Sequence, residues 1–219
     1  MVTAIVSAYR SAPYLDARLV NIADNPAIDE TVVVCQSGSP DHKIASSYEG
    51  ITVITTDDVP TLYRAWNMAI RRATSDYLIV ANADDRYGNL RPLVEALNRG
   101  YDIAYGDQDI YEDYSRPPVG RYTWREGGLR ELLQGCYLGP MPMWRRSLHD
   151  EVGYFDESYH VAGDYDFWLR LAIAGKRMYH VREVVGDYLR RPDSLERREP
   201  VRTLWETARA RAAAKQKTR

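Results

Sequence analysis

The sequence predicts an α/β fold in which a mostly parallel central sheet is flanked by helices on both sides. Short β-branched segments alternate with helical segments along the first half, an order typical of parallel sheets. The predicted strands are apolar throughout rather than alternating, as expected of strands that are buried on both faces. The strands are expected at residues 3–8, 31–35, 51–55, 77–81 and 102–106.

The helices between these strands are predicted from the spacing of their apolar residues. They are expected at residues 14–24, 40–48, 61–73 and 89–99. The segment "TLYRAWNMAIRRA" (61–73) has the clearest helical period. Its apolar positions are Leu62, Ala65, Trp66, Ala69 and Ile70.

The pattern changes after residue 107. The stretch "DQDIYEDYSRPPVGRYTW" (107–124) predicts two antiparallel strands joined by a Pro-Gly turn. A short helix is expected at 128–133 and a longer one from about residue 163. Because no linker or internal repeat interrupts the chain, residues 1–195 are predicted to form one domain, followed by a basic tail at 196–219.

Composition excludes some classes of protein. The formal net charge of −2 over 219 residues gives no global field for nucleic acid. The N-terminus does not resemble a signal peptide, and no run approaches the roughly 18 apolar residues of a membrane span, so a cytoplasmic location is expected. Two cysteines give no disulfide framework, and Cys35 within "TVVVC" is expected to be buried.

The tail is the most strongly charged segment. Residues 197–219 carry eight Lys or Arg and two Glu, and they are predicted to form a helix. Such a helix is expected either to be solvated or docked on the domain. The functional alternative is peripheral contact with an anionic membrane surface or a partner.

The first candidate site is in "YLIVANADDRYG" (77–88), where a buried strand runs into Asp84 and Asp85. Ligands of parallel sheets bind beyond the carboxyl ends of the strands, so this acidic pair is expected at the same edge as "SAYRS" and "CQSGSPD". Two carboxylates in that position can share a hard divalent cation such as Mg²⁺. The alternative is an ordinary turn, for which Asp is also well suited.

The second candidate site is in "VAGDYDFWLRLAIAGKR" (161–177), where Asp164 and Asp166 fall in the first turn of a predicted helix. Carboxylates there are stabilised by free N–H groups and the helix dipole, which accounts for them without a function. The functional alternative is a general base, which must lie within hydrogen-bond reach of the hydroxyl that it deprotonates.

Five segments together resemble the family 2 glycosyltransferases with a GT-A (Rossmann-like) fold. They are "IVSAYRSAPYL", "VVVCQSGSPD", "TLYRAWNMAI", "YLIVANADD" and "GDYDFWLRLA", in the family's order and spacing. The resemblance covers about residues 2–195 and implies a nucleotide-sugar-binding half (1–106) and a small antiparallel acceptor-side half (107–195). It also implies inverting transfer from a UDP- or GDP-sugar to a hydroxyl, with Mn²⁺ or Mg²⁺ as cofactor.

The resemblance implies roles for residues on the donor side. Ser7 and Tyr9 match residues that meet the nucleotide base and ribose. Gln36 replaces the usual aspartate that bonds the base, and its amide offers both a donor and an acceptor. Asn67 matches an asparagine under the sugar-nucleotide, and Asp84 matches the ribose-binding carboxylate.

It also implies roles at the reacting centre. Asp85 matches the metal ligand of the DxD-type motif, in which Asn82 replaces the first aspartate. Asp164 matches the catalytic base, although Gly163 replaces a common neighbouring glutamate. Arg191 lies near the place of a metal- or phosphate-binding histidine and would contact the diphosphate directly.

The acceptor side is less defined. Trp144 is interpreted as core or as a wall of the acceptor pocket, and Asp166 is its neighbouring polar candidate. The acceptor itself stays open among a polysaccharide, a lipid-linked glycan and a protein.

Two other functions compete with transfer. A sugar nucleotidyltransferase would need a Gly-rich phosphate loop after the first strand, and "AYRSAPYLD" contains no glycine. A catalytically inactive nucleotide-sugar-binding or scaffold protein is compatible with Gln36 and Gly163. The presence of Asp84, Asp85 and Asp164 favours an enzyme.

Overall fold

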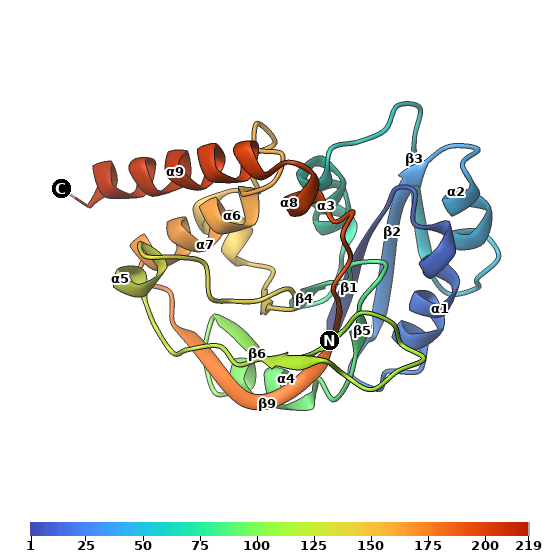
Figure 1. Ribbon diagram of the computed structural model, residues 1–219, viewed down its shortest axis with the longest axis horizontal. Coiled ribbons are helices and arrows are strands. Elements are labelled where there is room, and N and C mark those ends of the chain that lie inside the picture. The colour runs from blue at the N-terminus through green and yellow to red at the C-terminus, as the bar shows by residue number, and fades with distance from the viewer. Residues whose placement is uncertain (219) are drawn as a thin grey trace.

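The computed structural model describes residues 1–218, which fold around one sheet with the strand order β3-β2-β1-β4-β8-β6-β9-β5 (Figure 1). An additional short strand, β7, pairs with β6. The strands are β1 (Val2–Ala8), β2 (Glu30–Gln36), β3 (Thr52–Thr56), β4 (Tyr77–Val80), β5 (Arg86–Tyr87), β6 (Ile103–Tyr111), β7 (Gly120–Tyr122), β8 (Met143–Arg145) and β9 (Met178–Leu189). The helices are α1 (Ala12–Ala23), α2 (Pro40–Ala45), α3 (Leu62–Arg72), α4 (Arg91–Asn98), α5 (Leu129–Leu132), α6 (Leu148–Val152), α7 (Gly163–Ile173), α8 (Leu195–Arg198) and α9 (Pro200–Lys217).

The sheet is mostly parallel. Strands β3, β2, β1 and β4 run in one direction, and β6 and β9 share it. The short strands β8, β7 and β5 run the opposite way. The carboxyl ends of β1, β2 and β4 therefore meet at one edge, where ligands bind in sheets of this type.

Each face of the sheet has its own hydrophobic core. In β2, Val32 and Val34 pack on one side, and Val33 and Cys35 pack on the other. One core is completed by α3, α5, α6, α7 and α9, and the other by α1, α2 and α4. This two-sided burial is the reason that the strand segments are continuously apolar.

The predicted elements of the first half are confirmed within a few residues. The antiparallel pair after residue 107 is also confirmed, because the end of β6 pairs with β7. Strand β6 extends to Tyr111, beyond the predicted end at residue 106. The predicted tail helix is divided by Glu199 and Pro200 into α8 and α9.

Helix α9 is docked on the domain through one face. The carboxylate of Glu206, which is 3% exposed, accepts hydrogen bonds from the backbone N–H groups of His160, Val161 and Ala162. Figure 1 shows α9 beside α7, where Ala210 and Ala214 complete the contact. Among the helices of residues 1–218, none has the length and apolar character that would be needed to cross a bilayer.

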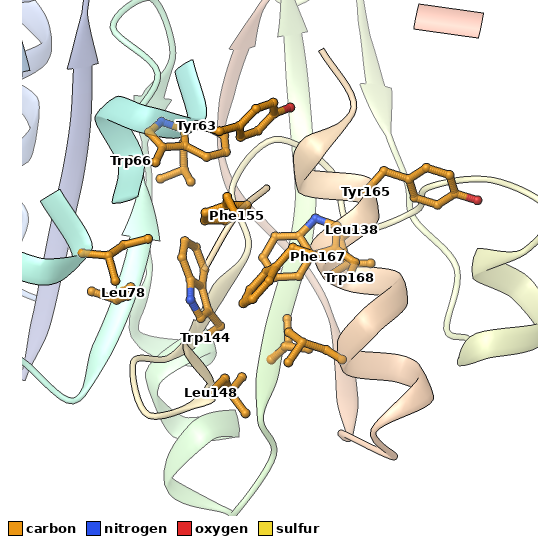
Figure 2. Close-up of a cluster of buried hydrophobic side chains, with 14 of the residues drawn as sticks. Tyr63, Trp66, Leu78, Leu138, Trp144, Leu148, Phe155, Tyr165, Phe167 and Trp168 are labelled. Carbon is orange, nitrogen blue, oxygen red and sulfur yellow. The ribbon is translucent and has the colours of Figure 1, made fainter. Parts of the chain in front are cut away.

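An aromatic cluster joins α3 to α7 (Figure 2). Beneath it, the ring of the buried His149 stacks on Phe167 with 4.7 Å between centroids. The indole N–H of Trp144 donates to Nε2 of His149 (3.0 Å), and Nδ1 lies 3.3 Å from the carbonyl oxygen of Gly153. The neutral tautomer with its proton on Nδ1 satisfies both contacts, and burial lowers the pKa of His149 to about 4.

Because His149 is buried as the neutral form, acid should destabilise the fold. Its pKa is lower in the folded chain than in the unfolded chain, so between about pH 6.5 and 4 the unfolded chain binds the extra proton. The free energy of unfolding should therefore fall by about 1.4 kcal/mol per pH unit from this site as the pH drops through that window. Urea denaturation at pH 5 and 7 measures the slope, and His149→Gln should flatten it. An equal slope in the variant would contradict this account.

Candidate active site

The acidic pair lies in the loop between β4 and β5. The Oδ1 atom of Asp85 accepts the backbone N–H of Leu189 (3.0 Å), and its Oδ2 accepts the amide of Asn82 (2.9 Å). The hydroxyl of Tyr114 donates to the backbone carbonyl of Asp84 (3.0 Å). The loop is thus held by β9 and by the segment after β6, and both carboxylates have fixed positions.

The two carboxylates differ in exposure. Asp85 is 3% exposed, whereas the side chain of Asp84 is 24% exposed. Burial, with the charge of Asp84, raises the pKa of Asp85 to about 7. Burial also raises the pKa of Asp84, against the lowering effect of Arg191. A bound cation would relieve both effects.

Arg191 is the partner of Asp84. Its Nη1 lies 3.3 Å from Oδ2 of Asp84, and its Nε donates to Asp193 (3.0 Å). The guanidinium also lies 4.8 Å from the ring centre of Tyr14. The segment after β9 therefore brings a cation to the acidic pair, and the predicted phosphate-binding role of Arg191 stays a prediction.

Arg18 of α1 is a further cation near this pair, and the sequence analysis missed it. It is 1% exposed, its guanidinium lies 3.8 Å from the ring centre of Tyr87, and Nη1 donates to Asn21 (2.7 Å). Its Nε and Nη2 atoms are buried without a hydrogen-bond partner in the described part of the chain. The charges of Asp85 and Asp84 support its protonation against the desolvation that lowers the pKa of Arg18. On a helix, this arginine gave no sequence signal beyond one charge at an apolar position.

The other predicted donor-side residues lie at the same edge of the sheet. Ser7 is half-buried in β1 and Tyr9 is 46% exposed just after it. Gln36 is half-buried at the end of β2, and its amide donates to the carbonyl of Asp57 (3.3 Å). Between Tyr9 and α1, Arg10 has a φ of 54°, an uncommon conformation for a non-glycine residue that marks a sharp turn.

Asp164 lies in the first turn of α7, as predicted. Its Oδ1 accepts the backbone N–H of Tyr165 (2.8 Å) and lies 3.2 Å from the hydroxyl of Tyr63. The same hydroxyl lies 2.7 Å from the carbonyl oxygen of Val161, so its single proton is shared between the two acceptors. Burial raises the pKa of Asp164. The hydrogen bonds that its carboxylate accepts from the Tyr165 N–H and from Tyr63 oppose the rise. The result is a fixed carboxylate that is more basic than an ordinary aspartate.

The glycine at position 163 has a physical reason. A Cβ atom at Gly163 would lie 2.7 Å from two ring carbons of Tyr63, closer than real contacts allow. Tyr63 is 1% exposed and packs against Trp66 and Phe155, so its ring has little room to move (Figure 2). The side chain that orients Asp164 therefore occupies the space that an acid at position 163 would need.

Removing the Tyr63 hydroxyl should change the pH dependence of turnover. Tyr63→Phe deletes a hydrogen bond that lowers the pKa of Asp164, so the acid limb of kcat/KM should move to higher pH. The kcat at neutral pH should fall roughly tenfold, since a hydrogen bond to a charged group contributes about 1.5 kcal/mol. The measurement is a pH–rate profile of both proteins.

Tyr105→Phe is the matched control for Tyr63→Phe. Tyr105 is equally buried, in the same core, and its hydroxyl donates to the carbonyl of Arg125 (2.7 Å) instead. The acid limb of kcat/KM for the Tyr105→Phe variant should coincide with that of the wild type. If both variants shift alike, general loosening of the core explains the effect, and Tyr63 has no special relation to Asp164.

Three residues that the sequence analysis did not single out lie near the reacting centre. The negative charge of Glu196 in α8 raises the pKa of Asp164, of Cys136 and of Tyr188, although burial is the larger cause in each case. The negative charges of Asp85 and Asp84 also raise the pKa of Tyr188. The charges of the acidic pair and of Glu196 therefore both act on Tyr188, a relation that depends on the fold.

Asn67 requires a correction. The sequence assigned it to the nucleotide-sugar, but it is 1% exposed. Its amide N–H groups donate to Phe155 and Glu157 (2.9 Å each), and its oxygen accepts the backbone N–H of Phe155 (3.1 Å). It anchors the loop before α7 to α3 and has no group left for a ligand.

The acceptor-side assignments of Trp144 and Asp166 are also corrected, although the alternative that Trp144 belongs to the core is confirmed. Trp144 is 0% exposed in the aromatic core, so it cannot form a pocket wall (Figure 2). Asp166 accepts a hydrogen bond from Arg170 (2.9 Å) and borders the small gap between α7 and α9. Along a helix, two residues of separation turn a side chain by about 200°, so Asp166 cannot share the direction of Asp164.

The carboxylate oxygens of the acidic pair are suitable ligands for a hard divalent cation. Asp84 and Asp85 offer carboxylate oxygens, which Mg²⁺ and Mn²⁺ accept. Within residues 1–218, no group of three or more His, Cys, Asp or Glu residues surrounds a common point. An ion here would therefore take its remaining ligands from phosphate oxygens and water, as Mg²⁺ commonly does.

Comparison with known proteins identifies the class. The sequence profile described as glycosyl transferase family 2 matches residues 3–155. The chain is 26% identical over 184 residues to the uncharacterized glycosyltransferase YwdF of Bacillus subtilis (strain 168), covering 78% of this chain and 68% of YwdF. The fold thus belongs to the GT-A class, and the chain is a member of glycosyl transferase family 2.

Solved structures show the same fold. S. aureus TarS 1–349 in complex with UDP-GlcNAc has a TM-score of 0.76 and 17% identity, covering 97% of this chain and 66% of that chain. The mannosyltransferase PcManGT from Pyrobaculum calidifontis, in complex with GDP-Man and Mn²⁺, has a TM-score of 0.69 and 18% identity, covering 95% and 64%. The chain thus spans slightly less than two thirds of the length of each.

Proposed function

We propose that the protein is an inverting, metal-dependent glycosyltransferase that moves a sugar from a UDP- or GDP-sugar to an acceptor hydroxyl. The observation that carries this proposal is the pairing of two acidic centres with different environments. Asp84 and Asp85 lie with Arg191 at the edge of the sheet, and Asp164 is held by Tyr63 and the backbone N–H of Tyr165 at the start of α7. One centre suits a leaving diphosphate and the other suits a nucleophile.

The reaction is a single displacement. The acceptor oxygen forms a bond to the anomeric carbon as the bond from that carbon to the phosphate oxygen breaks, and the electron pair leaves with the diphosphate. Asp164 takes the hydroxyl proton, for which its raised pKa is suited. Attack opposite to the leaving group inverts the anomeric configuration.

Arg191 would turn from Asp84 to the diphosphate when the donor binds, because phosphate oxygens match its planar fork. A divalent ion held by Asp84 and Asp85 would supply charge to the departing diphosphate. The family resemblance assigned the metal to Asp85 and the ribose to Asp84. The greater exposure of Asp84 favours a shared role, in which Asp84 reaches outward and Asp85 supports it from behind.

The nucleotide class of the donor is proposed from the residues at the edge of the sheet where the donor would bind. Ser7, Tyr9 and Gln36 follow β1 and β2, where a base and ribose would lie. The amide of Gln36 can pair with uracil or guanine. Complexes of relatives with UDP, UDP-GlcNAc and GDP-Man support the same donor classes for this chain.

The acceptor is a glycan, a lipid-linked glycan or a protein, and polysaccharide biosynthesis is one setting that fits. A cytoplasmic location with peripheral contact at the membrane face stays a prediction.

Isothermal titration calorimetry tests the donor site. UDP, GDP, UDP-GlcNAc, UDP-glucose and GDP-mannose are titrated with and without Mn²⁺. We expect micromolar affinity for one nucleotide class, only with the metal. Binding without hydrolysis or transfer over an acceptor panel would favour an inactive nucleotide-sugar-binding protein. No binding under any condition would contradict the donor-site assignment.

A further inference from the structure

The first turns of α9 expose three large apolar side chains. Val201, Leu204 and Trp205 are 79%, 74% and 61% exposed. Apart from Met1, they are the most exposed large apolar side chains of residues 1–218. Their spacing places them on the side of the helix opposite to Ala210 and Ala214, which dock on the domain. This cluster, named here the α9 patch, therefore projects away from the fold.

Basic side chains surround the α9 patch. Arg197, Arg198 and Arg202 are all exposed. Arg202 pairs with Glu199 (2.8 Å), and Arg197 and Arg198 form no ion pair within residues 1–218. An open hollow of about 630 Å³ brings the two kinds of side chain together. It is lined by Arg198, Glu199, Pro200, Val201, Arg202 and Trp205.

We propose that the α9 patch docks the protein on an anionic lipid bilayer, with Trp205, Leu204 and Val201 entering the interface and the arginines meeting lipid phosphates. Amphipathic helices with a Trp- and Leu-bearing face and flanking arginines bind such surfaces. Trp is favoured at the boundary between headgroups and acyl chains. A second copy of the chain is a poorer partner, since a two-fold contact would bring the same arginines together.

The docking surface adjoins the proposed reacting centre. Glu199, which lines the hollow, lies 3.4 Å from Nε2 of His160, and Glu206 of α9 accepts the backbone N–H of Ala162, two residues before Asp164. If the proposed transfer is correct, the membrane would be the plane from which a lipid-linked acceptor reaches Asp164. Bilayer binding itself is independent of transfer and is measured without any nucleotide.

Vesicle co-sedimentation tests the proposal. The whole chain is mixed with vesicles of phosphatidylcholine alone or with a quarter phosphatidylglycerol in 0.1 M salt. The wild type should bind only the anionic vesicles. Leu204→Ser with Trp205→Ser should lower the partition coefficient at least about tenfold, and Arg198→Ser with Arg202→Ser should lower it roughly fivefold per arginine. Because these side chains are exposed, the variants should keep the wild-type melting temperature.

The matched control removes the same charge from the other end of the helix. Lys215→Ser with Lys217→Ser changes positions about 15–20 Å from Trp205, beyond the Debye length of about 10 Å. Its partition should change less than about twofold. An equal loss in this variant, or no binding by the wild type, overturns the proposal. It is also overturned if light scattering shows self-association that the Leu204 and Trp205 changes abolish. Retained nucleotide binding in calorimetry would show that the proposed function survives such a result.

Discussion

Asp164→Asn should lower kcat about 10³-fold while the Kd for the nucleotide-sugar changes less than about twofold. The amide keeps the size of the side chain and can still accept the N–H of Tyr165, but it cannot take a proton from the acceptor. Since the proposed donor site is the acidic pair at the edge of the sheet, donor binding should not depend on this carboxylate. The measurement combines calorimetry with the nucleotide and steady-state release of UDP or GDP.

Asp166→Asn is the matched control for Asp164→Asn. Asp166 lies in the same turn of α7, but its carboxylate is paired with Arg170 beside α9. This variant should keep turnover within a few-fold of the wild type. Comparable losses in the two variants would show that the first turn of α7 matters for stability and that Asp164 is not the base. Loss of donor binding in Asp164→Asn would place this residue in the donor site instead.

The sequence predicted the first half of the fold because its signals there are local. Segments such as 31–35 are β-branched, buried on both sides and separated by helices, so each can be identified without its neighbours. Strand β9 was missed because "MYHVREVVGDYL" combines charges with a glycine and changes register between Gly106 and Gln108 of its partner β6. Its strand character comes from pairing across the sheet, which no local pattern records.

The residues of the candidate site likewise fall into those that the sequence could indicate and those that depend on packing between distant segments. Asp84 and Asp85 attracted attention as adjacent carboxylates at the end of a buried strand, and Asp164 was selected because its segment takes part in the family resemblance. Tyr63 and Arg18 could not be predicted, because their relation to these acids depends on the packing of α3 and α1. Asn67 shows the opposite case. The family resemblance assigned Asn67 to the nucleotide-sugar, but its side chain satisfies the backbone of a buried loop.

Asp84→Ala should remove the part of nucleotide affinity that depends on Mn²⁺, about 100-fold or more. Since residues 1–218 contain no metal-binding group of three or more His, Cys, Asp or Glu residues, an ion here would have only the acidic pair as acidic ligands. It should therefore bind weakly alone and tightly with the diphosphate, which would supply further oxygen ligands. Loss of the outward-facing carboxylate should therefore abolish the cooperation between metal and nucleotide. Calorimetry of UDP or GDP with and without Mn²⁺, and of Mn²⁺ alone, measures the affinity for the nucleotide, for the metal and for the two together. Because Asp84 is partly exposed, the melting temperature of the Asp84→Ala variant should stay near that of the wild type.

Asp193→Ala separates a metal role for Asp84 from a general effect on Arg191. Asp193 bonds the same guanidinium (3.0 Å) but is 66% exposed and lies outside the acidic pair, so its removal should leave the Mn²⁺ dependence intact. Equal losses in both variants would mean that Asp84 acts by orienting Arg191. Asp85→Ala should also weaken metal-dependent binding, but with a lower melting temperature, since Asn82 and the N–H of Leu189 lose their acceptor. If only this last variant loses the Mn²⁺ dependence, the ion is held by Asp85 alone, as the sequence first predicted.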